Sequence, residues 1–195
     1  MAEILLFHSV YGLRPAVRGA AERLRGAGHV VHVPDLYEGR TADTMADAKV
    51  IFEEIGRDAL LERAVRAAAP HSGTGLVYAG FSLGAAIAQT VGLADENARG
   101  LLLVHGTSDL AEDVEADLPV QLHVADPDLY ETADWLNSWY LDMRRAGADV
   151  EIFRYQGAGH LFTDPDLPDY DEHYAEQAWA IALDFLAEVG QARSA

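Results

Sequence analysis

A serine lies at the centre of the pentapeptide GFSLG, residues 80–84, which has the form G-x-S-x-G. An apolar run at residues 76–79 precedes it, and a run of small residues at 85–88 follows it. In a strand–turn–helix context this motif presents the serine hydroxyl to substrate, beside the amide groups of a helix N-terminus. The pattern predicts that Ser82 is a nucleophile for acyl transfer. The alternative is a turn whose serine only caps the helix.

Residues that follow Ser82 supply candidates for the base and the acid that such a serine requires. A serine hydroxyl is a weak nucleophile at neutral pH, so a base must accept its proton and a carboxylate must orient that base. His160 is the candidate base, in a loop that contains glycines, and Asp128 is the first candidate for the acid. Asp126 is the second candidate and Asp109 the third. The chain order serine, acid, histidine is that of α/β-hydrolases.

Acyl transfer also needs hydrogen-bond donors for the oxyanion that develops on the substrate carbonyl. The backbone N–H of Leu83 is one candidate, because it follows the nucleophile at the start of the predicted helix. The second donor should come from the loop after the first predicted strand, where Ser9 and Val10 lie. Tyr11 and Tyr37 are candidates for the wall of a substrate pocket, and packing is the alternative role for both.

These residues must be positioned by the elements around them, and short apolar runs alternate with helical patterns along the chain. The predicted strands are Ile4–Phe7, Val30–Val33, Leu76–Ala79, Leu101–Val104, Val120–Val124 and Val150–Tyr155. The predicted helices are one after Pro15, one from about Asp47 to Ala68, one beginning at Leu83 or Gly84, one carrying Ala133 to Met143, and one carrying Ala175 to Val189.

Alternation of strands and helices predicts an α/β fold with a mostly parallel sheet, right-handed crossovers and helices on both faces. We expect a compact α/β-hydrolase fold of about six or seven strands, with residues 1–195 forming a single domain. Such sheets carry their sites at the carboxyl ends of the strands. Ser82, the candidate acids and His160 all follow predicted strands, so we expect them to converge at that edge.

The charge and composition exclude several classes of partner. The formal net charge of −18 would repel nucleic acid and anionic membrane surfaces. No apolar stretch approaches membrane-spanning length, and the short apolar N-terminus lacks a basic region, so a cytoplasmic protein is expected. The chain has no cysteine, which excludes disulfides, a thiolate nucleophile and cysteine metal sites.

A metal site and a nucleotide cofactor are also weighed and not favoured. His8, His105 and His123 lie at or near predicted strand ends and could meet, with Asp109 or Asp126 as an oxygen ligand. None of them shows a ligand spacing such as H-E-x-x-H, and a histidine at a strand end is more often part of a hydrogen-bonded structure. No G-x-G-x-x-G or P-loop sequence is present. We therefore predict no metal and no cofactor.

The residues described so far resemble the dienelactone hydrolase family, a compact branch of the α/β-hydrolases. The resemblance covers nearly the whole chain. It rests on VPDLY at residues 33–37, GFSLG at 80–84, VQLH at 120–123 leading to Asp128, and YQGAGHLF at 155–162. It implies hydrolysis of small esters or lactones, with Ser82, Asp128 and His160 at the triad positions.

The chain departs from that family pattern at three positions. Ser82 stands where the best-known members carry a cysteine nucleophile, and Ser9 stands where they carry a glutamate that helps to control the thiol. Asp164 takes the place of an arginine that binds the carboxylate of the substrate in those enzymes. Reversal of charge at this position predicts a preference against anionic substrates.

The sequence therefore favours a serine hydrolase of small esters or lactones that acts through an acyl-enzyme. Two other classes stay open: an acyltransferase or thioesterase-like relative, which passes the acyl group to an acceptor other than water, and a non-catalytic binding protein on a hydrolase fold. A long Ser82–His160 separation would favour the binding protein. The expected partner is a small-molecule ester or lactone, and the sequence leaves the oligomeric state open between a monomer and a homodimer.

Overall fold

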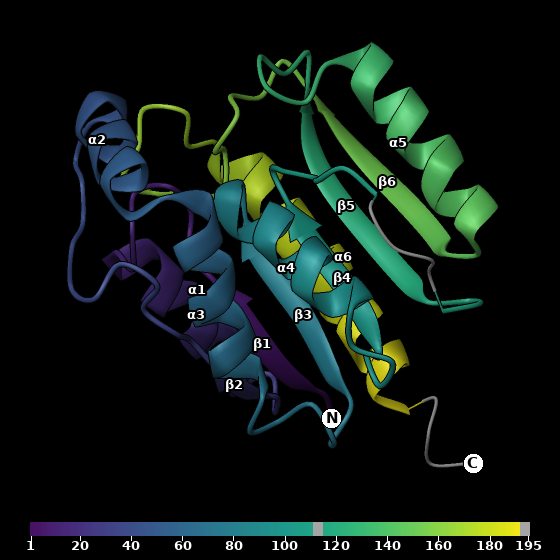
Figure 1. The fold of residues 1–195 in the computed structure, drawn as a ribbon. Coiled ribbons are helices and arrows are strands. Elements are labelled where there is room, and N and C mark those ends of the chain that lie inside the picture. Colours follow the sequence, from purple (N-terminus) through teal and green to yellow (C-terminus); the bar gives the residue numbers. More distant parts are fainter. Residues whose placement is uncertain (111–114, 192–195) are drawn as a thin grey trace.

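The computed structural model describes residues 1–110 and 115–191 of the chain, and six parallel strands in these residues form one sheet. The strand order is β2-β1-β3-β4-β5-β6, with every neighbouring pair parallel (Figure 1). The bounds are β1 Glu3–Phe7, β2 Val30–His32, β3 Leu76–Phe81, β4 Gly100–Val104, β5 Pro119–Asp126 and β6 Asp149–Gln156. The prediction of a parallel α/β sheet is confirmed.

Helices cover both faces of this sheet. Their bounds are α1 Pro15–Gly26, α2 Met45–Ile55, α3 Arg57–Ala68, α4 Leu83–Leu93, α5 Ala133–Ala146 and α6 Glu172–Gln191. Helices α1 and α6 lie on one face, while α3, α4 and α5 lie on the other (Figure 1). No helix in the described part of the chain is long and apolar enough to cross a membrane.

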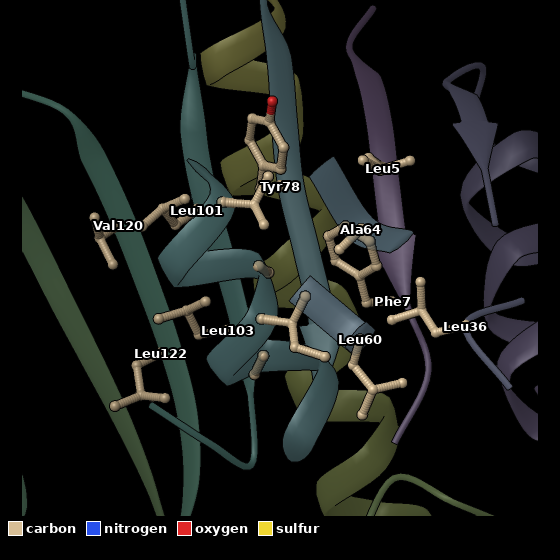
Figure 2. Close-up of a cluster of buried hydrophobic side chains, with 14 of the residues drawn as sticks. Leu5, Phe7, Leu36, Leu60, Ala64, Tyr78, Leu101, Leu103, Val120 and Leu122 are labelled. Carbon is tan, nitrogen blue, oxygen red and sulfur yellow. The ribbon is translucent and has the colours of Figure 1, made fainter. Parts of the chain in front are cut away.

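Two apolar layers hold the helices to the sheet, because alternate residues of a strand point to opposite faces. In β1, Leu5 and Phe7 belong to the layer under α3 and α4, whereas Ile4 and Leu6 belong to the layer under α1 and α6. Figure 2 shows part of the first layer, with labelled side chains from β1, β3, β4, β5 and α3. Strands covered on both sides are apolar nearly throughout, which explains the runs seen in the sequence.

The prediction of one helix from about Asp47 to Ala68 is wrong. Two helices occupy this stretch, and Gly56 separates them with φ of +80° and ψ of 149°. Its N–H still donates a hydrogen bond to the carbonyl of Phe52, which closes α2. A positive φ is accessible to glycine without steric cost, so Gly56 lets the chain turn where a continuous apolar pattern indicated a single helix.

The strand order places a crevice where the candidate residues lie. The chain adds β2 on one side of β1 and then crosses to add β3, β4, β5 and β6 on the other side. The direction in which strands are added therefore reverses between β1 and β3, which is the switch point of the sheet. Ligands of open α/β sheets bind outside the carboxyl ends of the strands at such a point. Ser9 follows β1 and Ser82 follows β3, so both are at this edge.

Candidate active site

Ser82 lies in a strained turn between β3 and α4. Its φ of +51° and ψ of −112° fall in a region that side-chain-bearing residues rarely adopt. The turn is possible because its neighbours are glycines: a Cβ on Gly80 would overlap the backbone of Gly84, and a Cβ on Gly84 would overlap the carbonyl of His8. A Cβ on Gly106 would lie 2.6 Å from the carbonyl oxygen of Ser82. Close packing on all sides therefore holds the serine in place.

The hydroxyl of Ser82, the imidazole of His160 and the carboxylate of Asp128 form a continuous chain of contacts. Ser82 Oγ lies 2.9 Å from His160 Nε2, and His160 Nδ1 lies 2.7 Å from Asp128 Oδ2. The Asp128 side chain is fully buried and that of His160 is 10% exposed. This arrangement matches a nucleophile, a base and an orienting acid in geometry.

Asp128 is held as an anion by the groups that surround it. Burial alone would raise its pKa, but the hydrogen bonds from His160 and from the backbone N–H of Glu131 and Tyr130 outweigh burial and lower the pKa. Those two amides donate to Oδ1 at 3.0 and 2.8 Å, which leaves Oδ2 for His160. Oδ1 thus accepts the two backbone N–H groups, and Oδ2 contacts the imidazole of His160.

The other candidate acids lie elsewhere. Asp126 Oδ2 accepts a hydrogen bond from Gln156 Nε2 at 2.6 Å, across the ends of β5 and β6. Asp109 is exposed and follows β4. Of the three carboxylates named from the sequence, the structure brings Asp128 to His160.

His105 is a neighbour of the base that the sequence analysis considered only as a metal ligand. It is fully buried, and its Nε2 lies 2.7 Å from Thr163 Oγ1 in the loop that carries His160. Its ring centroid lies 6.0 Å from that of His160, and its ring packs edge-on against the ring of Phe162. Burial, followed by the nearby His160, lowers the pKa of His105 well below its ordinary value, so it stays neutral beside the base.

The loop after β1 is close-packed and internally bonded. Ser9 is buried, its Oγ accepts the N–H of Tyr11 at 3.3 Å, and its carbonyl accepts His8 Nδ1–H at 2.8 Å. His8 Nε2 in turn accepts the N–H of Leu36 at 3.1 Å. Because Leu83 is the first residue of α4, its N–H is one of the four that find no partner within a helix. The role of Leu83, Ser9 and Val10 as oxyanion donors stays a prediction.

Tyr11 and Tyr37 are both buried, with exposures of 7% and 1%. Tyr37 packs edge-on against His8 with ring centroids 4.8 Å apart, and burial raises the pKa of its phenol to about 12. The guanidinium of Arg14 lies over the ring of Tyr11 at 5.1 Å. Neither tyrosine lines the two larger cavities described below, and their role in substrate binding stays a prediction.

A cavity of about 330 Å³ opens next to the candidate triad, on the face covered by α3, α4 and α5. Leu83 and Tyr130 line its catalytic end, where the Tyr130 ring lies 4.6 Å from that of His160. The other lining residues are Phe52, Arg57, Leu60, Leu61, Ala86, Ile87, Thr90, Thr107, Ser108, Asp109, Glu131 and Trp135. Among these others, Asp109 was a candidate acid in the sequence analysis, whereas Thr107 and Glu131 were assigned no role there, although both follow strand ends.

A second cavity of about 320 Å³ lies on the opposite side, between α1, α6 and the loop at residues 161–170. Ser9, Thr163 and Asp164 are among its lining residues, so it also borders the edge that carries the triad. An ion pair between Arg23 and Glu176 at 2.6 Å spans its wall. The two residues that flank the candidate nucleophile thus line different cavities, Phe81 this one and Leu83 the first.

Comparison with known proteins assigns this chain to a family. The sequence profile of the dienelactone hydrolase family matches residues 1–190 of its 195 residues. The chain belongs to the dienelactone hydrolase family. No curated protein sequence is significantly similar to it.

Solved structures with the same fold include a putative dienelactone hydrolase, a dienelactone hydrolase-like enzyme and an esterase. A putative dienelactone hydrolase from Klebsiella pneumoniae superposes with a TM-score of 0.79 at 18% identity, over 96% of this chain and 87% of the other. A dienelactone hydrolase-like promiscuous phosphotriesterase from metagenomic libraries gives 0.78 at 17% identity, over 97% and 87%. A thermophilic esterase from Thermogutta terrifontis, with propionate bound, gives 0.72 at 17% identity, over 97% and 84%. At these identities the likeness concerns the fold, and family membership supports a hydrolase.

Asp164, which departs from the dienelactone hydrolase pattern, does not stand as an isolated negative charge. Arg14 NH2 lies 3.6 Å from Asp164 Oδ1 and 3.6 Å from Asp166 Oδ2. The Asp164 side chain is 12% exposed, and burial raises its pKa. The expected effect against anionic substrates is therefore offset in part by the neighbouring guanidinium.

Among the described residues of this dienelactone hydrolase family member, His8, His105 and His123 do not bring their ring nitrogens together as one group of metal ligands. His123 contacts Tyr155 Oη and Gln121 Oε1, while His8 and His105 have the partners given above. In the described part of the chain, a different group of three Glu and His side chains is close enough to share an ion. It comprises Glu3, His32 and His71, near the opposite end of the strands, where both imidazoles contact Glu3 Oε1 at 2.8 and 3.1 Å.

Proposed function

We propose that this protein is a serine hydrolase of small carboxylic esters or lactones that acts through an acyl-enzyme. The observation that carries the proposal is the pair of contacts at 2.9 and 2.7 Å that link Ser82, His160 and Asp128. A Ser82–His160 distance within hydrogen-bond reach argues against a non-catalytic binding protein.

Acylation begins when Ser82 Oγ attacks the substrate carbonyl and His160 Nε2 accepts its proton. Asp128, whose lowered pKa keeps it ionised, stabilises the imidazolium and fixes the imidazole tautomer. The amides of Leu83 and of the Ser9–Val10 loop stabilise the oxyanion. When the tetrahedral intermediate collapses, its C–O bond to the leaving group breaks and His160 returns the proton to the departing oxygen. The acyl group is then bonded to Ser82.

Deacylation repeats these steps with water as the nucleophile. His160 accepts a proton from water as the water oxygen attacks the acyl carbonyl. His160 then returns that proton to Ser82 Oγ as the ester bond to the enzyme breaks. The product is a carboxylic acid, or a hydroxy acid when the substrate is a lactone. The esterase from Thermogutta terrifontis, whose structure holds propionate, supports a small acyl group.

Replacement of the nucleophile tests the proposal. We expect Ser82→Ala to lower kcat/KM by about 10⁴-fold or more on any 4-nitrophenyl ester that the wild type hydrolyses. A fluorophosphonate probe should label the wild type at Ser82 and leave the variant unlabelled. Ser72→Ala is the control, because Ser72 donates only to the carbonyl of Ala69 in the loop after α3.

Retention of wild-type esterase activity by Ser82→Ala, with no probe on Ser82 in the folded protein, would contradict the proposal. The acyltransferase alternative is separated by the products. With methanol or a small thiol present, a hydrolase releases mainly the free acid, whereas an acyltransferase forms mainly the new ester or thioester.

A further inference from the structure

Glu131 is a buried carboxyl beside the triad to which the proposed mechanism assigns no step. Only 8% of the residue is exposed, and it is one of the residues that line the 330 Å³ cavity. Its backbone N–H donates to Asp128 Oδ1 at 3.0 Å, which ties it to the catalytic acid. A glutamate is rarely buried to this extent unless its charge is paired.

The hydrogen-bond partners of the Glu131 side chain are neutral. Oε1 accepts the backbone N–H of Thr107 at 3.1 Å, and Oε2 accepts the Thr107 hydroxyl at 2.6 Å. The hydroxyl oxygen of Thr107 in turn accepts Trp135 Nε1–H at 2.7 Å. Within residues 1–110 and 115–191, Glu131 forms no salt bridge with Lys, Arg or His.

This carboxylate has unused capacity to accept hydrogen bonds. Its two oxygens offer about four acceptor positions, and Thr107 occupies two of them. Burial, and to a lesser degree the nearby Asp128, raises the pKa of Glu131. A buried charge without a counter-ion is costly, and a cationic ligand group would remove that cost.

The cavity suits a chain that runs from the serine to this carboxyl. Its catalytic end lies at Leu83, next to the nucleophile, and its walls include Phe52, Leu60 and Ile87. These side chains would shield an alkyl chain from water. Arg57 also lines the cavity, but this residue is exposed, so water screens its charge more than that of Glu131.

We propose that Glu131 binds a primary ammonium group on the acyl portion of the substrate, so that the enzyme prefers amino-substituted esters. This inference rests on the proposed function. The ammonium donates to the free acceptor positions of the carboxylate while the ester carbonyl lies at Ser82 Oγ. The net charge of −18 adds to the preference, because it attracts cations and repels carboxylate-bearing esters.

The test compares 4-nitrophenyl esters of heptanoic acid, 6-aminohexanoic acid and pimelic acid. These acyl chains have nearly the same length and end in a methyl, an ammonium and a carboxylate group. For the wild type we expect kcat/KM to be at least tenfold higher for the ammonium ester than for the methyl ester, and lowest for the carboxylate ester.

Glu131→Gln should lower the ammonium-to-methyl ratio of kcat/KM at least tenfold. Glutamine has the same shape and keeps a carbonyl oxygen for the Thr107 amide, so a merely structural role would change both esters alike. Asp134→Asn is the control, because Asp134 is an exposed carboxylate three residues away in the first turn of α5. Its ratio should stay within twofold of the wild type.

An unchanged ratio in folded, active Glu131→Gln would overturn the inference. A second measurement uses the wild type alone: hexylamine should inhibit hydrolysis of the heptanoate ester at a concentration at least tenfold lower than hexanoate does, and the reverse order would also overturn it. Activity of Ser82→Ala on all three esters would instead show that the proposed function fails. Failure of the two proposals is thus distinguishable.

Discussion

At the scale of single residues, burial and hydrogen bonding distinguish carboxylates that are alike in sequence. Asp126 is the last residue of β5 and Asp128 lies two positions further on, yet Asp128 has a fully buried side chain against His160, whereas Asp126 contacts Gln156. A carboxylate that stabilises an imidazolium must face it from a site with little water. Only the second aspartate meets that condition.

Replacement of the two aspartates by asparagine should separate their roles. Asp128→Asn should lower kcat by about 10³–10⁴-fold, because the amide no longer stabilises the imidazolium or holds the correct tautomer. Asp126→Asn, the matched control, should stay within a few-fold of the wild type. Steady-state kinetics on one 4-nitrophenyl ester suffice, and losses of similar size in the two variants would contradict the assignment.

At the scale of secondary-structure elements, the position of α4 depends on its closeness to the sheet. Helix α4 begins directly after Ser82 and packs against β1, β3 and β4. Gly84 makes this approach possible, because a Cβ there would lie 2.5 Å from the carbonyl oxygen of Phe7. The candidate nucleophile is therefore positioned by the contact of a helix with strands, and not by its own turn alone.

A methyl group at Gly84 should disturb both stability and activity. We expect Gly84→Ala to lower the free energy of unfolding by about 1–3 kcal/mol or more, since the backbone it would meet cannot move like a flexible side chain. Activity should fall as well, because a shift of α4 moves Ser82 and the amide of Leu83. Urea unfolding and ester hydrolysis measure the two effects.

Gly19→Ala provides the control for this prediction. Gly19 lies within α1, and a Cβ there would meet no heavy atom within 4 Å. Alanine is favoured over glycine inside a helix, so this variant should be more stable by about 0.5–1 kcal/mol. If the two variants changed stability by the same amount, close packing of α4 could not be the reason.

At the scale of the whole molecule, buried histidines link stability to pH. Burial lowers the pKa of His8, His105 and His123, in the last case to about 3. In the unfolded chain a histidine has a pKa of about 6.5, so the unfolded state binds more protons than the folded state below that pH. Stability should therefore fall as the pH decreases from about 6.5, by up to about 1.4 kcal/mol per pH unit for each such histidine.

His123→Gln should remove the contribution of one buried histidine to the pH dependence of stability. Glutamine can contact Tyr155 and Gln121 but does not titrate, so the slope of unfolding free energy against pH should decrease by about 1 kcal/mol per unit between pH 5.5 and 6.5. His173→Gln, at an exposed position on α6, should leave the slope unchanged. Urea titrations at several pH values measure it, and an unchanged slope in His123→Gln would contradict the prediction.

The type of fold and the order of the candidate residues follow from the amino-acid sequence alone. Alternating apolar strands and amphipathic helices have a periodicity that depends only on local geometry, so the parallel sheet was predicted and confirmed. The motif around Ser82 and the chain order of Asp128 and His160 are local features in the same sense. A family resemblance read from these segments was confirmed over residues 1–190.

Which side chains meet depends on the packing of the folded chain. The contact between Asp128 and His160 joins residues 32 positions apart, and the environment of Glu131 depends on Thr107, which is 24 positions away. The break between α2 and α3 at Gly56 was not predicted from the sequence either, because a single residue with positive φ does not alter the apolar pattern. Hydrogen bonds and burial of this kind depend on how loops that are distant in sequence pack at the sheet edge. The periodicity of a sequence reflects local geometry and does not predict that packing.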